Sequence, residues 1–278
     1  MGTGFLRGLA DEAGVRVLAV DATAVAEEVR RRHALGPAAA RVAAEGMVAA
    51  QLMSAWIKGE ERVTLQVQAE RPRFALIADV AADGAMRGRF TPASIPDEDS
   101  FRGAVLVIKH DAERELYRGV APVEDTGFQG ALQGYLVRSQ QAVGIVRIAA
   151  VVTPEGVVAS AVGLLVEKLP DQDEGVFHDL FDGLAEADPG ALLRGVEAGD
   201  LWGFPLRILE RREVVFRCHC GREKSADILC SLGPEELRGL LEEQGGAEIT
   251  CNFCREVYRF DERELGSLIE EISPPRGG

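Results

Sequence analysis

The chain has 278 residues, of which 46% are hydrophobic, and this is enough for a substantial core and for more than one domain. Its formal net charge of −14 argues against nucleic acid as a partner, because affinity for the phosphate backbone comes from clustered Lys and Arg. No basic start precedes an apolar run at the N-terminus, and Arg147 and Pro154-Glu155-Gly156 interrupt the most apolar stretches, so we expect a cytoplasmic protein without a membrane span.

The first part of the chain combines two helical patterns with a series of strand patterns. Helix formers fill residues 22–33 and 38–57, and the second range carries a broad apolar face. Runs rich in β-branched and apolar side chains then occur at 62–69, 74–80, 104–109, 145–152 and 157–168. Helices followed by strands, without regular alternation of strand and helix, predict an α+β fold for residues 1–172.

The following segment, residues 173–215, has the pattern of a helical linker. Apolar side chains recur at helical spacing on both sides of Pro189-Gly190, which predicts short amphipathic helices. Isolated helices of this length are marginal in water, so their order has to come from docking onto another part of the protein. Such a segment could serve as a conformational switch, and a permanently docked linker fits the sequence equally well.

Four cysteines in two close pairs give the last part of the chain, residues 216–273, its chemistry. Cys218-x-Cys220 and Cys251-x-x-Cys254 supply four thiolates, which is the ligand set of a tetrahedral structural zinc site, with one Zn²⁺ per chain. A helix starting at Pro234, a hairpin around the second pair and a terminal helix with an Asp261/Glu264 capping box are predicted around them. The core of so small a module is weak, so loss of zinc should unfold it.

The remaining cysteine and the histidines are weaker candidates. His219 stands between two ligands whose side chains must converge, so we expect it to point outward. Cys230 is expected to be partly buried and outside the metal site. The other histidines, at positions 33, 110 and 178, belong to no convergent pattern and are interpreted as structural.

The spacing of the two cysteine pairs also allows redox chemistry. Residues two or three apart can bring their α-carbons within the range that a disulfide requires, about 4.4–6.8 Å. Thiolates held by zinc are the oxidisable form of cysteine, and converting either pair to a disulfide removes two ligands at once. Oxidation would thereby release zinc, and loss of zinc would unfold the module.

The order CxC, about thirty residues, CxxC, with "LGPEEL" between the pairs and "YRF" after them, resembles the zinc module of the heat shock protein 33 family, redox-regulated holdase chaperones. Earlier segments resemble the same family. They are "RRHALGPAAARVAAEGMVAAQLMSAWIKGEERVTLQVQ", "DGAMRGRF", "GYLVRSQQ" and "AVGLLVEKLP", so that the resemblance covers essentially the whole chain. Two segments depart from the family's usual form: "SQQ" stands in place of Ser-Glu-Gln, and "AVGLLVEKLP" in place of a more glycine-rich segment.

The resemblance implies a cytoplasmic chaperone, not an enzyme, that is zinc-bound and inactive when reduced. It further implies that oxidants form Cys218–Cys220 and Cys251–Cys254 disulfides, release zinc and loosen the linker. Apolar surface exposed in this way would then bind unfolding client proteins. Members of the family commonly do this as homodimers, so the resemblance implies a homodimer after oxidation.

Several apolar residues of the linker are candidates for binding clients, and core packing is the alternative interpretation of each. They are Phe177, Leu180, Phe181, Leu184, Trp202, Phe204 and Leu206.

Two other functions compete with the redox chaperone. One is a zinc-ribbon adaptor that binds a protein partner and is indifferent to oxidants; nucleic acid is an improbable partner because residues 217–278 hold 8 Lys and Arg against 13 Asp and Glu. The other is a zinc hydrolase, which is disfavoured because four thiolates leave no coordination position open for water.

Overall fold

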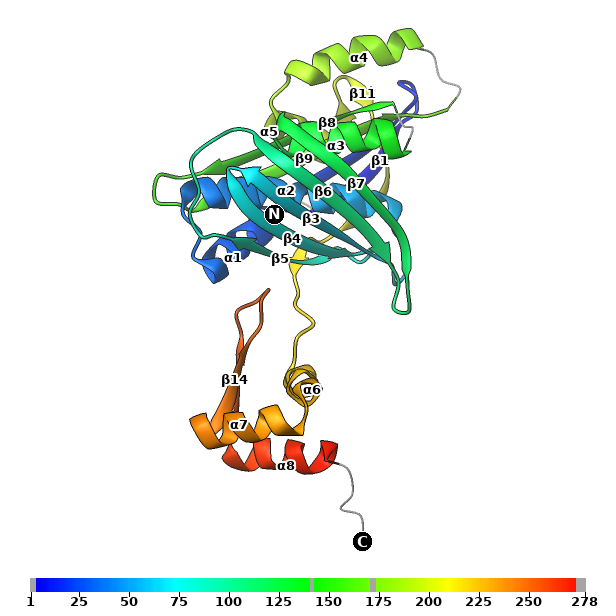
Figure 1. The fold of residues 1–278 in the computed structure, drawn as a ribbon. Helices are drawn as coiled ribbons and strands as arrows, with labels where there is room; N and C mark the ends of the chain where they lie inside the picture. The colour runs from blue at the N-terminus through cyan, green and yellow to red at the C-terminus, as the bar shows by residue number, and fades with distance from the viewer. Residues whose placement is uncertain (1–3, 141–142, 171–173, 274–278) are drawn as a thin grey trace. The chain divides into compact units, whose positions relative to one another are not determined.

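The computed structural model describes residues 4–140, 143–170 and 174–273, and the chain divides into two compact units, residues 1–217 and 218–278 (Figure 1). The predicted boundary between 172 and 173 lies outside the described residues. The segment 173–215, where it is described, belongs to the first unit. The three-part division of the chain stays a prediction.

Two β-sheets form the frame of the first unit. The six-stranded sheet has, in spatial order, β13 (Val215–Phe216), β5 (Ala85–Thr91), β4 (Arg73–Ala81), β3 (Arg62–Arg71), β6 (Phe101–His110) and β7 (Glu115–Thr126). The five-stranded sheet has β12 (Arg207–Arg212), β1 (Phe5–Ala10), β2 (Val15–Asp21), β9 (Val158–Lys168) and β8 (Gly144–Val152). All pairings are antiparallel except that of β13 with β5.

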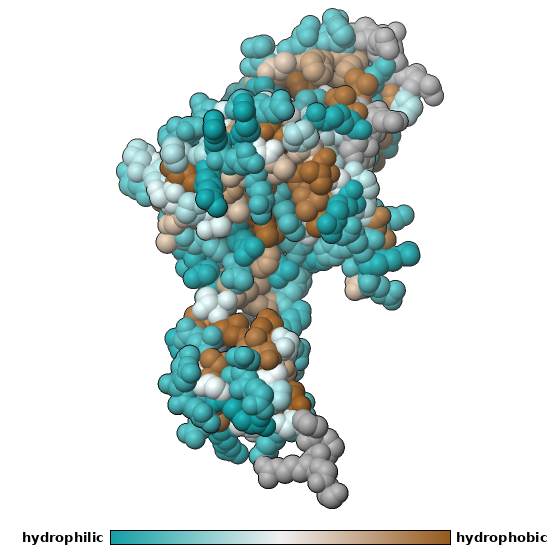
Figure 2. Space-filling model, viewed as in Figure 1, coloured by the Kyte–Doolittle hydropathy of each residue, from teal (hydrophilic) through white to brown (hydrophobic). Residues whose placement is uncertain are grey.

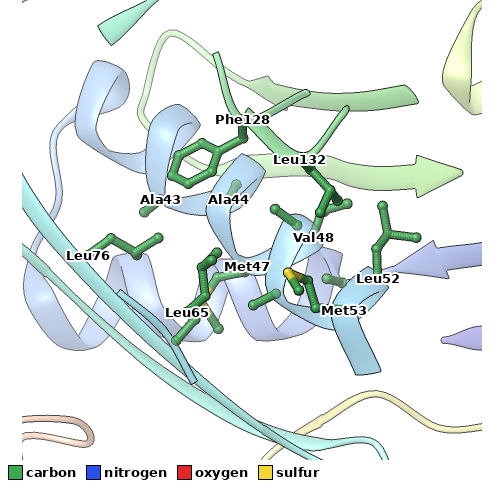
Figure 3. Packing of buried hydrophobic residues seen from close by; sticks show 14 of the residues in the cluster. Ala43, Ala44, Met47, Val48, Leu52, Met53, Leu65, Leu76, Phe128 and Leu132 are labelled. Atoms are coloured by element: carbon green, nitrogen blue, oxygen red, sulfur yellow. The ribbon is translucent and has the colours of Figure 1, made fainter. Parts of the chain in front are cut away.

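Helix α2 (Pro37–Met53) packs between the two sheets, and a 3₁₀ turn at Ser54–Trp56 follows it (Figures 1 and 3). Thirteen of its 17 residues are buried, which agrees with the broad apolar face predicted for 38–57. Close approach requires glycine at two places: a Cβ at Gly46 would lie 2.2 Å from Leu76 Cδ2, and one at Gly163 would lie 2.4 Å from Val48 Cγ1. The α1 (Thr23–His33) and α3 (Phe128–Tyr135) helices contribute to the same core.

A buried ionic group links three strands of the six-stranded sheet. Asp79 is 4% exposed and accepts hydrogen bonds from Arg62 at 2.8 Å and from Arg87 at 3.0 Å. These two guanidinium groups outweigh the desolvation of the carboxylate and lower the pKa of Asp79. The structure explains both residues of the Arg87-Gly88 dipeptide. Arg87 pairs with Asp79, and position 88 requires glycine because a Cβ there would lie 2.5 Å from Met47 Sδ.

Two helices cover the other face of the five-stranded sheet. They are α4 (Glu174–Glu186) and α5 (Pro189–Ala198), and their apolar side chains form one cluster with those of β1, β2, β8 and β9. A short hairpin of β10 (Asp200–Leu201) and β11 (Phe204–Pro205) follows. The sequence predicted that these helices need a docking surface, and this sheet face provides it.

The second unit is built from three helices and a hairpin. Its elements are α6 (Arg222–Leu232), α7 (Pro234–Gln244), β14 (Gly246–Thr250), β15 (Val257–Asp261) and α8 (Glu262–Ile272). The predicted capping box is confirmed: Asp261 Oδ1 accepts from the Glu264 amide at 2.9 Å, and Glu264 Oε2 accepts from the Asp261 amide at 3.1 Å. The buried cluster of this unit is small and consists of Leu229, Leu237, Phe260, Leu265 and Ile269.

The surface in view is mostly hydrophilic, with hydrophobic side chains in separate patches (Figure 2). Among the described helices, none combines the length and the apolar character needed to cross a membrane. A mixed architecture of helices and sheets was predicted and is confirmed. The sequence patterns missed β1, β2, β5, β7, α3, α6 and the strands after α5 in the first unit.

Candidate metal centre

Two structural features bring the cysteine pairs together in the second unit. Cys218 and Cys220 lie in the extended segment before α6, whose N-cap is Gly221. Cys251 and Cys254 lie in the turn that connects β14 to β15. The Cys251 amide donates to the Glu256 carbonyl at 2.8 Å and closes this turn, and Arg255 adopts a left-handed φ of 61° within it.

All four sulfur atoms lie within 4.8 Å of one another. Cys218 Sγ is 3.7 Å from Cys251 Sγ, and Cys220 Sγ is 3.2 Å from Cys254 Sγ, so each cysteine of the first pair contacts one of the second. Four sulfurs around one Zn²⁺ at about 2.3 Å are about 3.8 Å apart in a regular tetrahedron. The donor set and its spacing therefore fit a single tetrahedral ion with few changes of position.

Burial affects the thiols of this cluster. Desolvation raises the pKa of Cys220 and also that of Cys254, which is 6% exposed. Thiols of this kind keep their protons until a cation replaces them, and the cation then stabilises the thiolates in place of water. The site is therefore suited to an ion that binds sulfur strongly.

One hydroxyl group contacts the cluster directly. Tyr258 Oη on β15 donates to Cys220 Sγ at 3.1 Å, and this hydrogen bond raises the pKa of the phenol, which stays protonated. The sequence reasoning missed Tyr258. Its position in the β15 strand pattern could be predicted, but the pattern does not show that the hydroxyl reaches across to the segment before α6.

Arg222 connects the elements that carry the cysteines. Its Nη2 donates to the Arg259 carbonyl at 2.9 Å and to Glu264 Oε1 at 2.5 Å, and its guanidinium lies 4.5 Å from the centre of the Phe260 ring. The start of α6, strand β15 and helix α8 thereby share one side chain. This arrangement holds the first cysteine pair near the second.

His219 and Cys230 lie outside the cluster of four sulfurs. His219 is exposed, and its carbonyl accepts from Lys224 Nζ at 2.8 Å. Cys230 is half-buried within α6, and burial raises the pKa of its thiol. The sequence patterns had instead placed it in a segment before a helix. The error arose because α6 itself was not predicted.

The candidate client-binding residues all belong to the first unit. Phe177, Leu180 and Leu184 of α4 are buried, and Trp202, in the turn between β10 and β11, is 53% exposed. The other three, Phe181, Phe204 and Leu206, are half-buried and pack against the α4–α5 cluster. Six of the seven side chains thus take part in packing here, and their role toward clients stays a prediction.

The sequence and the structure are similar to those of a known family of proteins. The family model described as "Hsp33 protein" matches residues 4–261, which include all four clustered cysteines. The chain belongs to the Hsp33 family. Proteins named "33 kDa chaperonin" from Citrifermentans bemidjiense and Halalkalibacterium halodurans are each 31% identical to it. Each match covers 98% of this chain. It covers 98% of the first relative and 100% of the second.

A solved structure has the same fold. The crystal structure of the 33 kDa chaperonin, a heat shock protein 33 homologue, from Thermotoga maritima matches with a TM-score of 0.86 at 22% identity. The match covers 97% of this chain and 98% of that one. The predicted resemblance to the heat shock protein 33 family is therefore confirmed.

Proposed function

We propose that this protein is a cytoplasmic, redox-regulated holdase chaperone that is zinc-bound and inactive when reduced. The observation that carries the proposal is the gathering of four thiols within 4.8 Å in a unit with a small apolar core. Cys218, Cys220, Cys251 and Cys254 would hold one Zn²⁺, which keeps the sulfurs as thiolates and stabilises the fold of residues 218–273. Four sulfur ligands leave no position for a substrate water, so we propose no enzymatic activity.

The switch consists of two disulfide-forming steps, one for each sequence-adjacent pair. A thiolate sulfur attacks one oxygen of a peroxide, the O–O bond breaks and a sulfenic acid forms. The neighbouring thiolate then attacks that sulfur, an S–S bond forms and the oxygen leaves as water after protonation. Two electrons pass from the pair to each peroxide, which yields two waters. The Cys218–Cys220 and Cys251–Cys254 disulfides leave no thiolate for the metal.

The surface released by the switch would be the underside of α4 and α5 together with the sheet face beneath them. Short helices are marginal alone, so α4 and α5 depend on this docking and are the elements most easily lost. Phe177, Leu180 and Leu184 would then be exposed together with Leu6, Val17 and other members of the cluster. An apolar surface of this kind, in an acidic and soluble chain, suits unfolded client proteins.

The end of the linker is anchored much more firmly than α4 and α5. Strand β12 is hydrogen-bonded to β1, and Arg212 at its end donates to Ser54 Oγ at 2.5 Å and to the Ala82 carbonyl. The guanidinium of Arg212 also lies 3.7 Å from the centre of the Phe5 ring. We therefore place the mobile part of the linker at residues 174–206, with 207–216 staying on the first unit.

Hydrogen exchange of the zinc-loaded protein before and after peroxide treatment tests this proposal. Amides of 174–206 and 218–273 should lose protection on oxidation, those of β12 should keep theirs, and the oxidised protein should suppress aggregation of an unfolding client. A Cys230→Ser variant should respond identically, because Cys230 lies outside the cluster. Unchanged protection of α4 and α5 in oxidised protein would favour a zinc-ribbon adaptor without redox switching.

Association of the oxidised protein as a homodimer is part of the same proposal. It is supported by the family alone. Sedimentation of the reduced and oxidised protein over a range of concentrations would test it, with a larger species expected only after oxidation.

A further inference from the structure

The hydrogen bond between Tyr258 and Cys220 is a part of the metal centre that the redox mechanism does not require. Tyr258 is the second residue of β15, where its backbone is opposite Ile249, and its ring is half-buried against the small core of the second unit. Its hydroxyl is 3.1 Å from Cys220 Sγ. Cys220 Sγ in turn lies 3.2 Å from Cys254 Sγ, so the hydroxyl donates to a sulfur that itself contacts the second cysteine pair.

A hydroxyl that donates to a thiolate changes both its geometry and its reactivity. The hydrogen bond fixes the direction of the sulfur lone pairs, and groups that orient metal ligands in this way contribute strongly to metal affinity. The bond also withdraws electron density from the sulfur that must attack a peroxide oxygen, so it lowers the nucleophilicity of that sulfur. The same hydroxyl should therefore strengthen metal binding and slow oxidation.

We propose that Tyr258 is a positioning residue that sets the oxidation threshold of the centre through Cys220. This inference rests on the proposed function, because it assumes that the cluster holds a metal and reacts with peroxide. When Cys220 Sγ is the attacking sulfur, it supplies the electron pair that breaks the peroxide O–O bond, and the Tyr258 hydroxyl stabilises that electron pair in the resting thiolate. Loss of the hydroxyl makes this electron pair more available for attack on the peroxide.

The test is a Tyr258→Phe variant, which keeps the ring in the core and removes only the donor. Zinc affinity, measured by competition with a chelator, should fall about tenfold. The thiolate-to-cobalt charge-transfer band of the Co²⁺-loaded variant should shift to lower energy, because an electron leaves a sulfur without a hydrogen-bond donor more easily. Zinc release by peroxide should become several-fold faster. Tyr117→Phe, at a half-exposed tyrosine of β7 in the first unit, is the matched control and should change none of these.

A Tyr258→Leu variant separates the hydroxyl from the ring. If only ring packing matters, Tyr258→Phe will equal the wild type while Tyr258→Leu is defective, and the inference is overturned. Loss of the far-UV circular dichroism signal of Tyr258→Phe at saturating zinc would also overturn it, since the hydroxyl would then act through the fold. If the wild type itself shows no thiolate–cobalt band, the proposed function fails first, and the two failures are thus distinguishable.

Discussion

The two units of the chain differ in what keeps them folded. In residues 1–217, α2 lies in a large apolar cluster between two sheets, and 13 of the 17 residues of the helix are buried. In residues 218–278 the buried cluster is small, and four thiols gather within 4.8 Å. Apolar burial can account for the stability of the first unit, while the second needs an additional contribution, which we assign to zinc.

This difference suggests why a redox signal can act on one unit without unfolding the other. Oxidation changes sulfur chemistry, and the described cysteines all belong to the second unit. Among the described residues of the core between the two sheets there is no cysteine, and the sulfur groups are those of methionine. Peroxide oxidises methionine more slowly than a thiolate. The α4 and α5 helices, which dock on that frame, are the part whose order the switch is proposed to control.

Removal of the metal should give the largest effect. Structural zinc contributes about 10–16 kcal/mol in small zinc-finger peptides, more than the folding free energy of a typical domain. A Cys251→Ser variant should therefore bind zinc poorly, lose protection in residues 218–273 and expose the α4–α5 surface without oxidant. Hydrogen exchange and binding of a hydrophobic dye measure this. A Cys251→Ser variant that stays compact and inert would show that the metal and the linker are not coupled.

Equivalent leucine truncations should act differently in the two units. Leu52 and Leu237 are both fully buried, the first between the sheets and the second in the small apolar cluster of the second unit. Leu52→Ala should cost about 2–5 kcal/mol in unfolding of the first unit and leave zinc affinity unchanged. Leu237→Ala should lower zinc affinity, because metal binding and folding are coupled there, and a loss of about 2 kcal/mol corresponds to roughly 30-fold. Equal zinc affinities of the two variants would contradict the proposal that zinc stabilises only the second unit.

Glu45 should give the first unit a pH-dependent stability. Desolvation raises the pKa of this α2 carboxyl from 4.5 to about 6, although Arg41 lies 3.3 Å away. Because the folded state holds the proton more tightly, this contribution is complete below about pH 4.5 and is lost as the pH rises through 6, a difference of about 2 kcal/mol.

A comparison of Glu45→Gln with the wild type in urea at pH 4.5 and pH 7 isolates that contribution. The variant should gain stability relative to the wild type as the pH rises, since Gln does not titrate. A stability difference that is the same at both pH values would show that Glu45 is not desolvated as described.

The smallest effect is expected at the turn of the second cysteine pair. Arg255 has a φ of 61°, which costs a residue with a Cβ about 1–2 kcal/mol relative to glycine. Arg255→Gly removes this strain but increases the freedom of the unfolded chain, so zinc affinity should rise only slightly. Chelator competition measures it, and a large loss of affinity would mean that the Arg255 side chain itself supports the centre.

The sequence predicted elements well where one local signal decided them. The cysteine spacing indicated that the four thiols gather in one cluster, and the Asp261/Glu264 pair indicated the start of α8. Strands β1 and β2 were missed because Gly8 and the charged residues near them weaken the alternation, and only pairing with β12 and β9 makes this segment a sheet. The Tyr258–Cys220 bond depends on how the hairpin faces another segment, which no local pattern contains.

The most direct test of the central claim follows zinc and chaperone activity in the same samples. Reduced, zinc-loaded protein is treated with peroxide or hypochlorous acid, released zinc is read with a colorimetric chelator, and suppression of client aggregation is measured at each time. Zinc release and holdase activity should rise together, and a thiol reductant supplied with zinc should reverse both. Zinc that stays bound, or activity that does not depend on oxidant, would contradict the redox switch and leave the metal centre with a structural role.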